Sequence, residues 1–206
     1  MSAELESGRA REIDVSAIIE SRSLNGFNYR LIVGSWLIAM FDGFDLSIAS
    51  FTAQYMQDDL GLSDGQLANV LSAGLLGTVI GAVVFSWLSD KIGRRPVLIG
   101  CSIAFGLLTA ATGLAPSYEW LLAIRLAEGI ALGANVPIIW ALNSEYAPKR
   151  MRATGITVIM VGFSVGTSGA GPVVVRLVPE IGWRGIMFAG GGLSLLAGMF
   201  LLYALP

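Results

Sequence analysis

The chain has 206 residues, of which 54% are hydrophobic and only 14% are charged, and its mean hydropathy is +0.70. A soluble domain carries about a quarter charged residues, so this composition argues against a soluble protein. The net charge of -2 gives no reason to expect nucleic acid as a partner. The sequence has no histidine and a single cysteine, Cys101, which removes His-activated nucleophiles, His-ligated metals and internal disulfides. We therefore expect a membrane protein that is not an enzyme and has no catalytic residues, metal or cofactor.

The first 28 residues are polar and of mixed charge, and they contain no apolar run of signal-peptide type. We expect residues 1–28 to form a cytoplasmic N-terminal arm and residues 29–206 to form one membrane bundle. Six apolar stretches follow the arm, each of about 19 to 25 residues, enough for a helix to cross ~30 Å of hydrocarbon. The expected spans cover residues 31–51, 67–89, 97–115, 120–142, 154–178 and 185–203.

The Lys and Arg residues are concentrated in the arm and in the segments after the second and fourth spans, and are almost absent after the first and third. Because cytoplasmic loops carry the excess of Lys and Arg, we expect both termini of the chain in the cytoplasm. The similar segments KIGRR and EIGWR follow the second and fifth spans. Their equivalent positions favour an all-α bundle with a 3+3 inverted repeat.

Small residues recur along the second and fifth spans at helical spacing. The residues concerned are Gly74, Gly77 and Gly81 in the second span and Gly162, Gly166 and Ala170 in the fifth. Small-xxx-small faces let membrane helices approach closely, so we expect both spans to pack through these faces.

Four ionisable residues lie inside the spans, Asp42 and Asp45 in the first and Arg125 and Glu128 in the fourth. Each costs at least ~2.5 kcal/mol at the bilayer centre, so these side chains should face the protein interior and serve a function. A rise of ~1.5 Å per residue places Arg125 level with Asp45, and Glu128 level with Asp42. Three acids against one arginine should leave one or two acids protonated. Proton release there, and pairing of an anion with Arg125, would suit a proton-coupled carrier.

Two alternatives stay open for these residues. Arg125 and Asp45 would also be explained as a buried ion pair that only braces two helices. Asn135 lies on a face similar to that of Glu128, where it either lines the same cavity or makes a hydrogen bond between helices. Pro137 is expected to loosen the backbone just after it.

The segment SDKIGRRP at residues 89–96 is short and charged, and Gly93 suits its tight turn. Asp90 would pair with a nearby arginine as a latch, or the basic residues would simply hold the loop in the cytoplasm. A second charge cluster follows the fourth span and comprises Glu145, Lys149, Arg150 and Arg152.

These features resemble the N-terminal half of a major facilitator superfamily transporter. The similar elements are the six spans, the loop SDKIGRRP, Arg125 with Gly129 and Gly133, EYAPKRMR after the fourth span, and GWR before the sixth. Within the superfamily, DGFD at residues 42–45 and the segment NSEYAPKRMRAT resemble the aromatic acid:proton symporters, which import benzoate-like and hydroxybenzoate-like carboxylates. The resemblance runs from about Asn28 to the end of the chain.

The resemblance implies that the first-span acids and Arg125 serve transport and that the inner loop serves gating. With the residue arguments above, the expected proton-coupling and substrate residues are Asp42, Asp45, Arg125, Glu128 and Asn135. The expected gating residues are Asp90, Gly93, Arg94, Arg95, Glu145 and Arg152. Two positions depart from the family pattern: Ser86 replaces a glycine of the loop motif, and Glu128 replaces a small or uncharged residue.

The resemblance therefore implies a proton-coupled symporter that imports small organic, in particular aromatic, carboxylates through the bacterial inner membrane. Because the family has twelve spans, the expected partners are an organic anion, a proton, the lipid bilayer and a second six-helix half, from the same protein or another chain. The alternatives are another metabolite:proton symporter, a drug efflux antiporter, or a truncated membrane remnant that does not transport. Gly171-Pro172 resembles the antiporter motif of the fifth span, but Val173 to Val175 lack its glycine pair.

Overall fold

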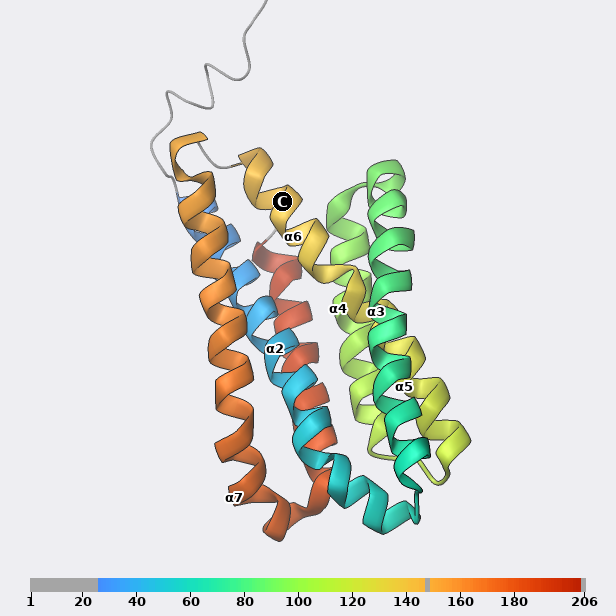
Figure 1. Cartoon of the computed structure of the whole chain (residues 1–206). Helices are drawn as coiled ribbons and strands as arrows, with labels where there is room; N and C mark the ends of the chain where they lie inside the picture. The colour runs from blue at the N-terminus through green and yellow to red at the C-terminus, as the bar shows by residue number, and fades with distance from the viewer. Residues whose placement is uncertain (1–25, 147–148, 205–206) are drawn as a thin grey trace, which may run out of the picture.

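The computed structural model describes residues 26–146 and 149–204, and all of its regular secondary structure is helical (Figure 1). The helices are α2 (Gly26–Leu60), α3 (Asp64–Ile92), α4 (Arg94–Thr112), α5 (Tyr118–Gly133), α6 (Asn135–Tyr146) and α7 (Lys149–Ala204). The expected all-α class is therefore confirmed. Residues 1–25 of the predicted N-terminal arm lie outside the described residues, and its last three residues already belong to α2.

Five helices of the described chain are long and apolar enough to cross a membrane, where we expected six. The fourth predicted span corresponds to α5 and α6 together, and the fifth and sixth both lie in α7, whose apolar part is Met151–Tyr203. The backbone of α7 leaves the helical region at Gly182, with φ 70° and ψ 170°. Figure 1 shows the two limbs of α7 running in opposite directions. The fifth and sixth predicted spans therefore follow one another within α7, on either side of Gly182, and the expected count of six separate membrane-spanning helices is not confirmed.

The helix ends follow from local sequence. At the start of α3, the Gln66 backbone N–H donates to Ser63 Oγ at 3.3 Å and the Ser63 N–H donates to Gln66 Oε1 at 2.9 Å, which forms a capping box. Ser117 caps α5 by accepting a bond of 3.4 Å from the Trp120 N–H. Only Gly93 separates α3 from α4, and its φ of 97° is one that favours glycine. The predicted tight turn at Gly93 is confirmed.

The fourth predicted span is interrupted between Gly133, where α5 ends, and Asn135, where α6 begins. Pro137 has no N–H and cannot donate to the carbonyl of Gly133 one turn earlier. The next donor, the Ile138 N–H, reaches the Ala134 carbonyl at 3.4 Å, which is long for a helical hydrogen bond. The loosened backbone expected near Pro137 is therefore present.

The tightest helix contacts are made at glycines. A Cβ atom on Gly129 of α5 would overlap the carbonyl group of Gly74 on α3, and one on Gly166 of α7 would overlap the carbonyl of Met40 on α2. Other glycines that make the same kind of contact include Gly77 and Gly81 on α3 and Gly162 on α7. Since no side chain separates these backbones, dispersion contacts hold the pairs α3–α5 and α2–α7 at close range. The predicted small-residue faces are confirmed at these positions.

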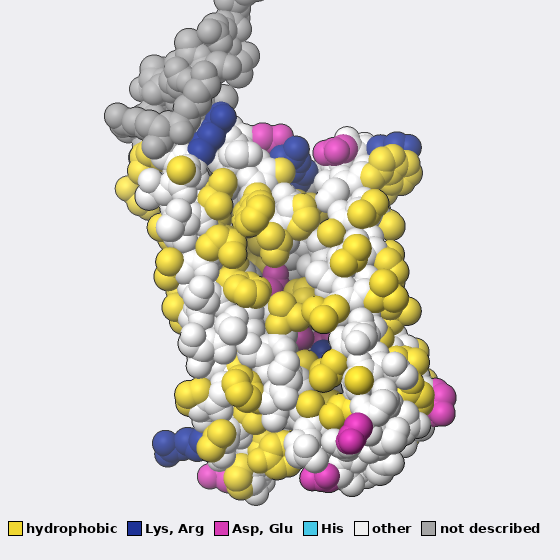
Figure 2. All heavy atoms as spheres, in the orientation of Figure 1, with side chains coloured by type: hydrophobic (Ala, Val, Ile, Leu, Met, Phe, Trp, Pro, Cys, Tyr) yellow, Lys and Arg dark blue, Asp and Glu magenta, His cyan; other side chains and the backbone are white. Residues whose placement is uncertain are grey.

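The outward side of α3 carries large apolar side chains that the rest of the described chain leaves uncovered. They include Leu75, Val79, Val83 and Trp87, each more than half exposed. Figure 2 shows hydrophobic side chains spread over the height of the molecule, with most charged side chains at its two ends. A surface of this kind suits contact with lipid or with other apolar helices, as expected of an integral membrane protein.

Candidate functional site

The four ionisable residues predicted inside the spans are all buried, with exposed fractions of 2% for Asp42, 4% for Asp45, 6% for Arg125 and 2% for Glu128. They do not form one cluster. Asp45, Arg125 and Glu128 contact one another, whereas Asp42 bonds to Asn135. The expected inward orientation of the four residues is therefore confirmed, and their arrangement is a pair of separate polar networks.

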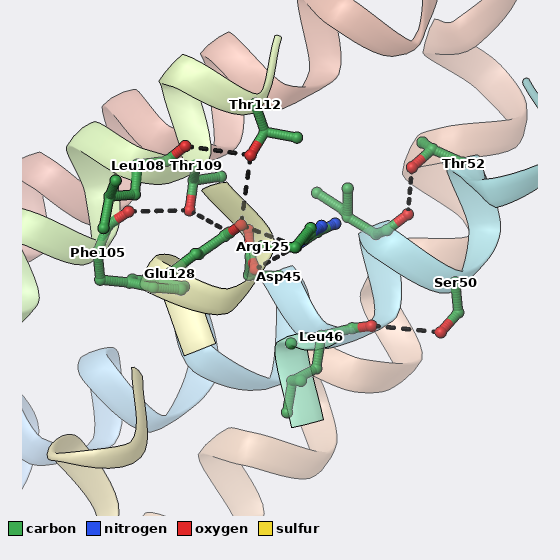
Figure 3. A network of polar contacts seen from close by, with 12 residues as sticks. Asp45, Leu46, Ser50, Thr52, Phe105, Leu108, Thr109, Thr112, Arg125 and Glu128 are labelled. Carbon is green, nitrogen blue, oxygen red and sulfur yellow. Dashed lines mark hydrogen bonds and ion pairs between the residues drawn. The ribbon is translucent and has the colours of Figure 1, made fainter. Parts of the chain in front are cut away.

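The first network is centred on the guanidinium group of Arg125 (Figure 3). Its Nη1 atom lies 3.0 Å from Glu128 Oε2 and 3.8 Å from Asp45 Oδ2. Residues three apart share one face of a helix, which is why α5 directs both of its charged groups into the interior of the bundle. The Arg125–Asp45 contact confirms that these two residues lie level.

Two threonines on α4 complete the coordination of Glu128. Thr109 Oγ1 donates to Glu128 Oε1 at 2.8 Å, and Thr112 Oγ1 donates to Oε2 at 3.3 Å. Figure 3 shows the carboxylate between the two threonines and Arg125. Both oxygens of Glu128 thus have donors. Sequence reasoning missed the threonines, for which the only signal is their spacing of one helical turn in an apolar segment.

The second network links Asp42 to α4 and α6. Asn135 Nδ2 donates to Asp42 Oδ1 at 3.0 Å, and Asn135 Oδ1 accepts from Ser102 Oγ at 3.4 Å. Asn135 therefore makes the hydrogen bond between helices that was one of its two predicted roles. The second oxygen of Asp42, Oδ2, is buried without a hydrogen-bond partner among the described residues. Asp42 and Asn135 line a small pocket of about 10 Å³, which is space for about one water molecule.

Arg125 also lines a larger pocket, of about 110 Å³, between α2, α3 and α5. The other lining residues are Leu46, Ala49, Ser50, Val70, Leu71, Gly74 and Leu75. Two donors of Arg125, Nε and Nη2, are buried without a hydrogen-bond partner within the described chain, and so is Asp45 Oδ1. In Figure 2, charged side chains of both signs are visible in a hollow midway along the face shown. Unpartnered guanidinium donors beside apolar walls suit an anion with an apolar body.

The predicted inner-loop residues form an ion-pair network at the end of the bundle where α3 meets α4. Arg94 Nη1 lies 2.9 Å from Glu145 Oε1, and Arg94 Nη2 lies 3.8 Å from Asp90 Oδ1. Arg95 Nη2 donates to the carbonyl of Leu202 at 3.2 Å, which ties the loop to the end of α7. Glu145 thus bonds across to the α3–α4 turn and links the two clusters that we predicted separately.

The remaining members of the second predicted cluster are Lys149, Arg150 and Arg152. Arg152 lies in the first turns of α7, and its side chain is half-buried. The side chains of Lys149 and Arg150 are outside what the structure describes. The contacts of Asp90 with Arg94 agree with a latch, and the gating function of these residues stays a prediction.

A third network, at the opposite end of the bundle, was not predicted. Arg184 Nη2 lies 2.9 Å from Asp59 Oδ2, and Arg184 Nη1 donates to the carbonyls of Gly113 at 3.2 Å and Ala115 at 3.0 Å. Trp183 Nε1 donates to the same Asp59 oxygen at 3.2 Å. One side chain therefore joins α2, the α4–α5 turn and the reversal in α7. The sequence signal was the lone arginine of GWR opposite an acidic segment.

A bundle of apolar membrane helices with a buried arginine, partner acids and an open pocket near its middle is characteristic of membrane transport proteins. A family model described as "Major Facilitator Superfamily" matches residues 35–206. The chain belongs to the major facilitator superfamily, a family of transporters and not of enzymes.

Among curated relatives, the chain is similar to the 4-hydroxybenzoate transporter PcaK of Pseudomonas aeruginosa, with 35% identity over 94% of this chain and 43% of the relative. It is also similar to the gallate transporter of Pseudomonas putida, with 37% identity over 94% of this chain and 43% of that protein. The chain thus spans less than half the length of these relatives. It resembles the aromatic acid:proton symporters, as the DGFD segment indicated.

Among solved structures, the fold is similar to that of the proton:xylose symporter XylE bound to 6-bromo-6-deoxy-D-glucose, with a TM-score of 0.77 and 18% identity over 86% of this chain and 44% of that chain. A bacterial homologue of the human lysosomal transporter Spinster gives a TM-score of 0.77 with 21% identity over 89% of this chain and 45% of that chain. At these identities the likeness concerns the fold alone.

Proposed function

We propose that the chain forms the N-terminal bundle of a proton-coupled symporter that imports small aromatic carboxylates through the bacterial inner membrane. The observation that carries the proposal is the pocket of about 110 Å³ lined by Arg125, two of whose guanidinium donors are buried without a partner among the described residues. The names of the two Pseudomonas relatives, which refer to 4-hydroxybenzoate and gallate, support an aromatic carboxylate as the substrate class.

In this proposal, the substrate carboxylate binds the free edge of Arg125. Its Nε and Nη2 atoms form the planar pair of donors that matches two carboxylate oxygens. A buried donor without a partner costs about 1–3 kcal/mol, so a bound carboxylate would be favoured at this position. The aromatic ring would lie against Leu46, Leu71 and Leu75. A dry apolar cavity of about 150 Å³ holds benzene, so the pocket of about 110 Å³ would enclose only part of a benzoate-like molecule.

A second six-helix bundle would supply the opposite wall of the pocket. The chain covers only 43% of the length of the two Pseudomonas relatives, and the outward side of α3 is apolar and uncovered in the described residues. Alternating access then follows from rocking of the two bundles around the pocket, with the Asp90–Arg94–Glu145 network as an inner gate. The Lys and Arg distribution supports cytoplasmic termini for this bundle.

The pairing of helices supports the internal 3+3 repeat as part of the same proposal. α2 packs on the first limb of α7, α3 packs on α5, and α4 packs on the second limb of α7 through Gly106 and Gly191. An exchange of the first three spans with the last three leaves this pattern of pairs unchanged. Such symmetry is what an inverted repeat produces.

The proposal is tested by uptake of radiolabelled 4-hydroxybenzoate into cells that express the full-length gene product, with and without a protonophore. Uptake should depend on the proton gradient and should fall to background in Arg125→Ala. Glu119→Gln is the matched control, because Glu119 is an exposed acid on the same helix and should leave uptake unchanged. Uptake that persists without the gradient, or full uptake by Arg125→Ala, would overturn the proposal.

A further inference from the structure

We infer that Ser50 on α2 is a specificity-determining residue, which binds a hydroxyl group on the aromatic ring of the substrate at the position opposite the carboxylate. The inference rests on the proposed function, because it takes Arg125 as the partner of the substrate carboxylate. It adds to that function a preference for ring substituents that donate a hydrogen bond. The observations that carry it are the lining of the pocket and the hydrogen bond that Ser50 makes.

The pocket beside Arg125 is apolar except at two side chains. Its lining consists of Arg125, Ser50 and six residues without a hydrogen-bonding side chain, namely Leu46, Ala49, Val70, Leu71, Gly74 and Leu75. Among the described residues of this lining, Ser50 is therefore the one uncharged side chain that can bind a polar group. Ligand pockets of this type take their specificity from a few polar groups placed on apolar walls.

The position of Ser50 suits the far end of a substrate held by Arg125. Ser50 shares a face of α2 with Leu46, because residues four apart are neighbours on a helix. It follows Asp45 by five residues, which places it about 7.5 Å further along the helix axis. Asp45 in turn contacts Arg125, with 3.8 Å between Oδ2 and Nη1. A substrate whose carboxylate binds Arg125 would therefore reach Ser50 with the opposite end of its ring, and not with the positions next to the carboxylate.

The hydroxyl group of Ser50 is bound only weakly by its own helix. Its Oγ atom lies 3.4 Å from the carbonyl oxygen of Leu46 (Figure 3), well beyond the usual O–H···O distance of about 2.7–2.8 Å. A serine hydroxyl has one proton and two lone pairs. While the proton points at the Leu46 carbonyl, both lone pairs stay available to a ligand, and Ser50 is exposed. The side chain is thus an accessible acceptor.

An acceptor at this position selects ring substituents that donate. A phenolic hydroxyl group has a proton to donate to Ser50 Oγ, whereas a methoxy group has none and an unsubstituted ring makes no polar contact there. The net contribution of one hydrogen bond between uncharged groups corresponds to an affinity difference of about 2- to 10-fold. We therefore expect 4-hydroxybenzoate to bind more tightly than benzoate and 4-methoxybenzoate by a factor in this range.

The simpler role for Ser50 is the bond to its own helix, since serine side chains in helices can bond to the carbonyl four residues earlier. Ser164 on α7 provides a matched control. It is also exposed, and its Oγ atom donates to the carbonyl of Met160 at 3.2 Å, which is the same kind of contact. Ser164 is not part of the lining of the pocket. If the bond to the helix were the whole role of Ser50, removal of either hydroxyl would have the same effect on binding.

The test is competition binding to the purified full-length gene product, in which unlabelled 4-hydroxybenzoate, benzoate and 4-methoxybenzoate each displace radiolabelled 4-hydroxybenzoate. The wild type and Ser164→Ala should bind 4-hydroxybenzoate about 2- to 10-fold more tightly than the other two acids. Ser50→Ala should lose this preference and bind benzoate within about twofold of the wild-type affinity, because Arg125 and the apolar walls are unchanged. Ser50→Thr keeps the hydroxyl group and should retain the preference.

The outcomes separate the inference from the proposed function. A wild-type protein that binds none of the three acids would overturn the proposed function. Equal affinity of the wild type for all three acids, or an unchanged preference in Ser50→Ala, would leave that function standing and overturn the assignment of Ser50. The wild-type comparison needs no variant, so it decides even if Ser50→Ala does not fold.

Discussion

The variant Arg125→Lys distinguishes two roles for Arg125, which are binding of the substrate anion and bracing of two helices. In the structure, Nη1 of Arg125 serves Glu128 and Asp45, while Nε and Nη2 have no partner in the described chain. A lysine ammonium is a compact charge without the planar fork, so it would pair with Glu128 and leave the substrate without its two donors. Loss of one hydrogen bond to a charged group costs about 1.5–3 kcal/mol. This corresponds to an affinity for the carboxylate that is weaker by about 10- to 150-fold.

The assay is equilibrium binding of radiolabelled 4-hydroxybenzoate to purified full-length protein, with the thermal midpoint measured in parallel. Arg125→Lys should bind weakly and unfold near the wild-type temperature, because the ion pair with Glu128 is retained. Glu119→Gln should match the wild type in both measurements. An affinity of Arg125→Lys within about threefold of wild type, with an intact fold, would refute the reasoning and favour the brace.

Three further predictions concern the contacts around the site. Gly129→Ala should lower stability by about 1–3 kcal/mol because a Cβ atom there overlaps a backbone carbonyl, whereas Gly169→Ala, with open space around it, should be neutral in the same thermal-melting assay. Arg94→Glu should slow uptake, and the double variant Arg94→Glu with Glu145→Arg, in which the two charges are exchanged, should recover part of it. Each single variant should change stability by less than about 1 kcal/mol, because the ion pair is partly exposed. Arg184→Lys, which cannot reach two carbonyls and a carboxylate at once, should lower the thermal midpoint more than Arg176→Lys, a change of an exposed arginine on the same helix.

The sequence was sufficient to locate the charged centre of the bundle, because the cost of charge in lipid makes every ionisable residue in an apolar span conspicuous. Arg125 and Asp45 were matched by counting residues along two helices, and the structure places them in contact. The same count placed Glu128 level with Asp42; their shared depth stays a prediction, and the two side chains bond to different partners. Depth fixes the level of a residue in the membrane, but the rotation of each helix decides which neighbour it meets.

The hydroxyl partners were beyond sequence reasoning for a different reason. Thr109 and Thr112 each have a carbonyl of their own helix within reach, so an isolated α4 would leave neither unsatisfied. Their role depends on where α5 places Glu128, which is a matter of tertiary packing. The reversal at Gly182 lies in the gap that the sequence left between the fifth and sixth predicted spans, at residues 179–184. What the sequence did not show is that α7 stays helical up to Gly182 on both sides.

Helix α3 connects the pocket to the ion-pair network at the end of the bundle. It lines the pocket at Val70 and Gly74, and from Gly74 to Asp90 it extends about 24 Å to the ion-pair network. Backbone-to-backbone contact at Gly74 and Gly129 couples a tilt of α3 to α5, whereas Glu145 lies on α6, beyond the loosened backbone near Pro137. A tilt of about 5° at the pocket would displace the far end by about 2 Å. If α3 tilts relative to α6, we expect the Arg94–Glu145 ion pair, with 2.9 Å between Nη1 and Oε1, to lengthen by a similar amount.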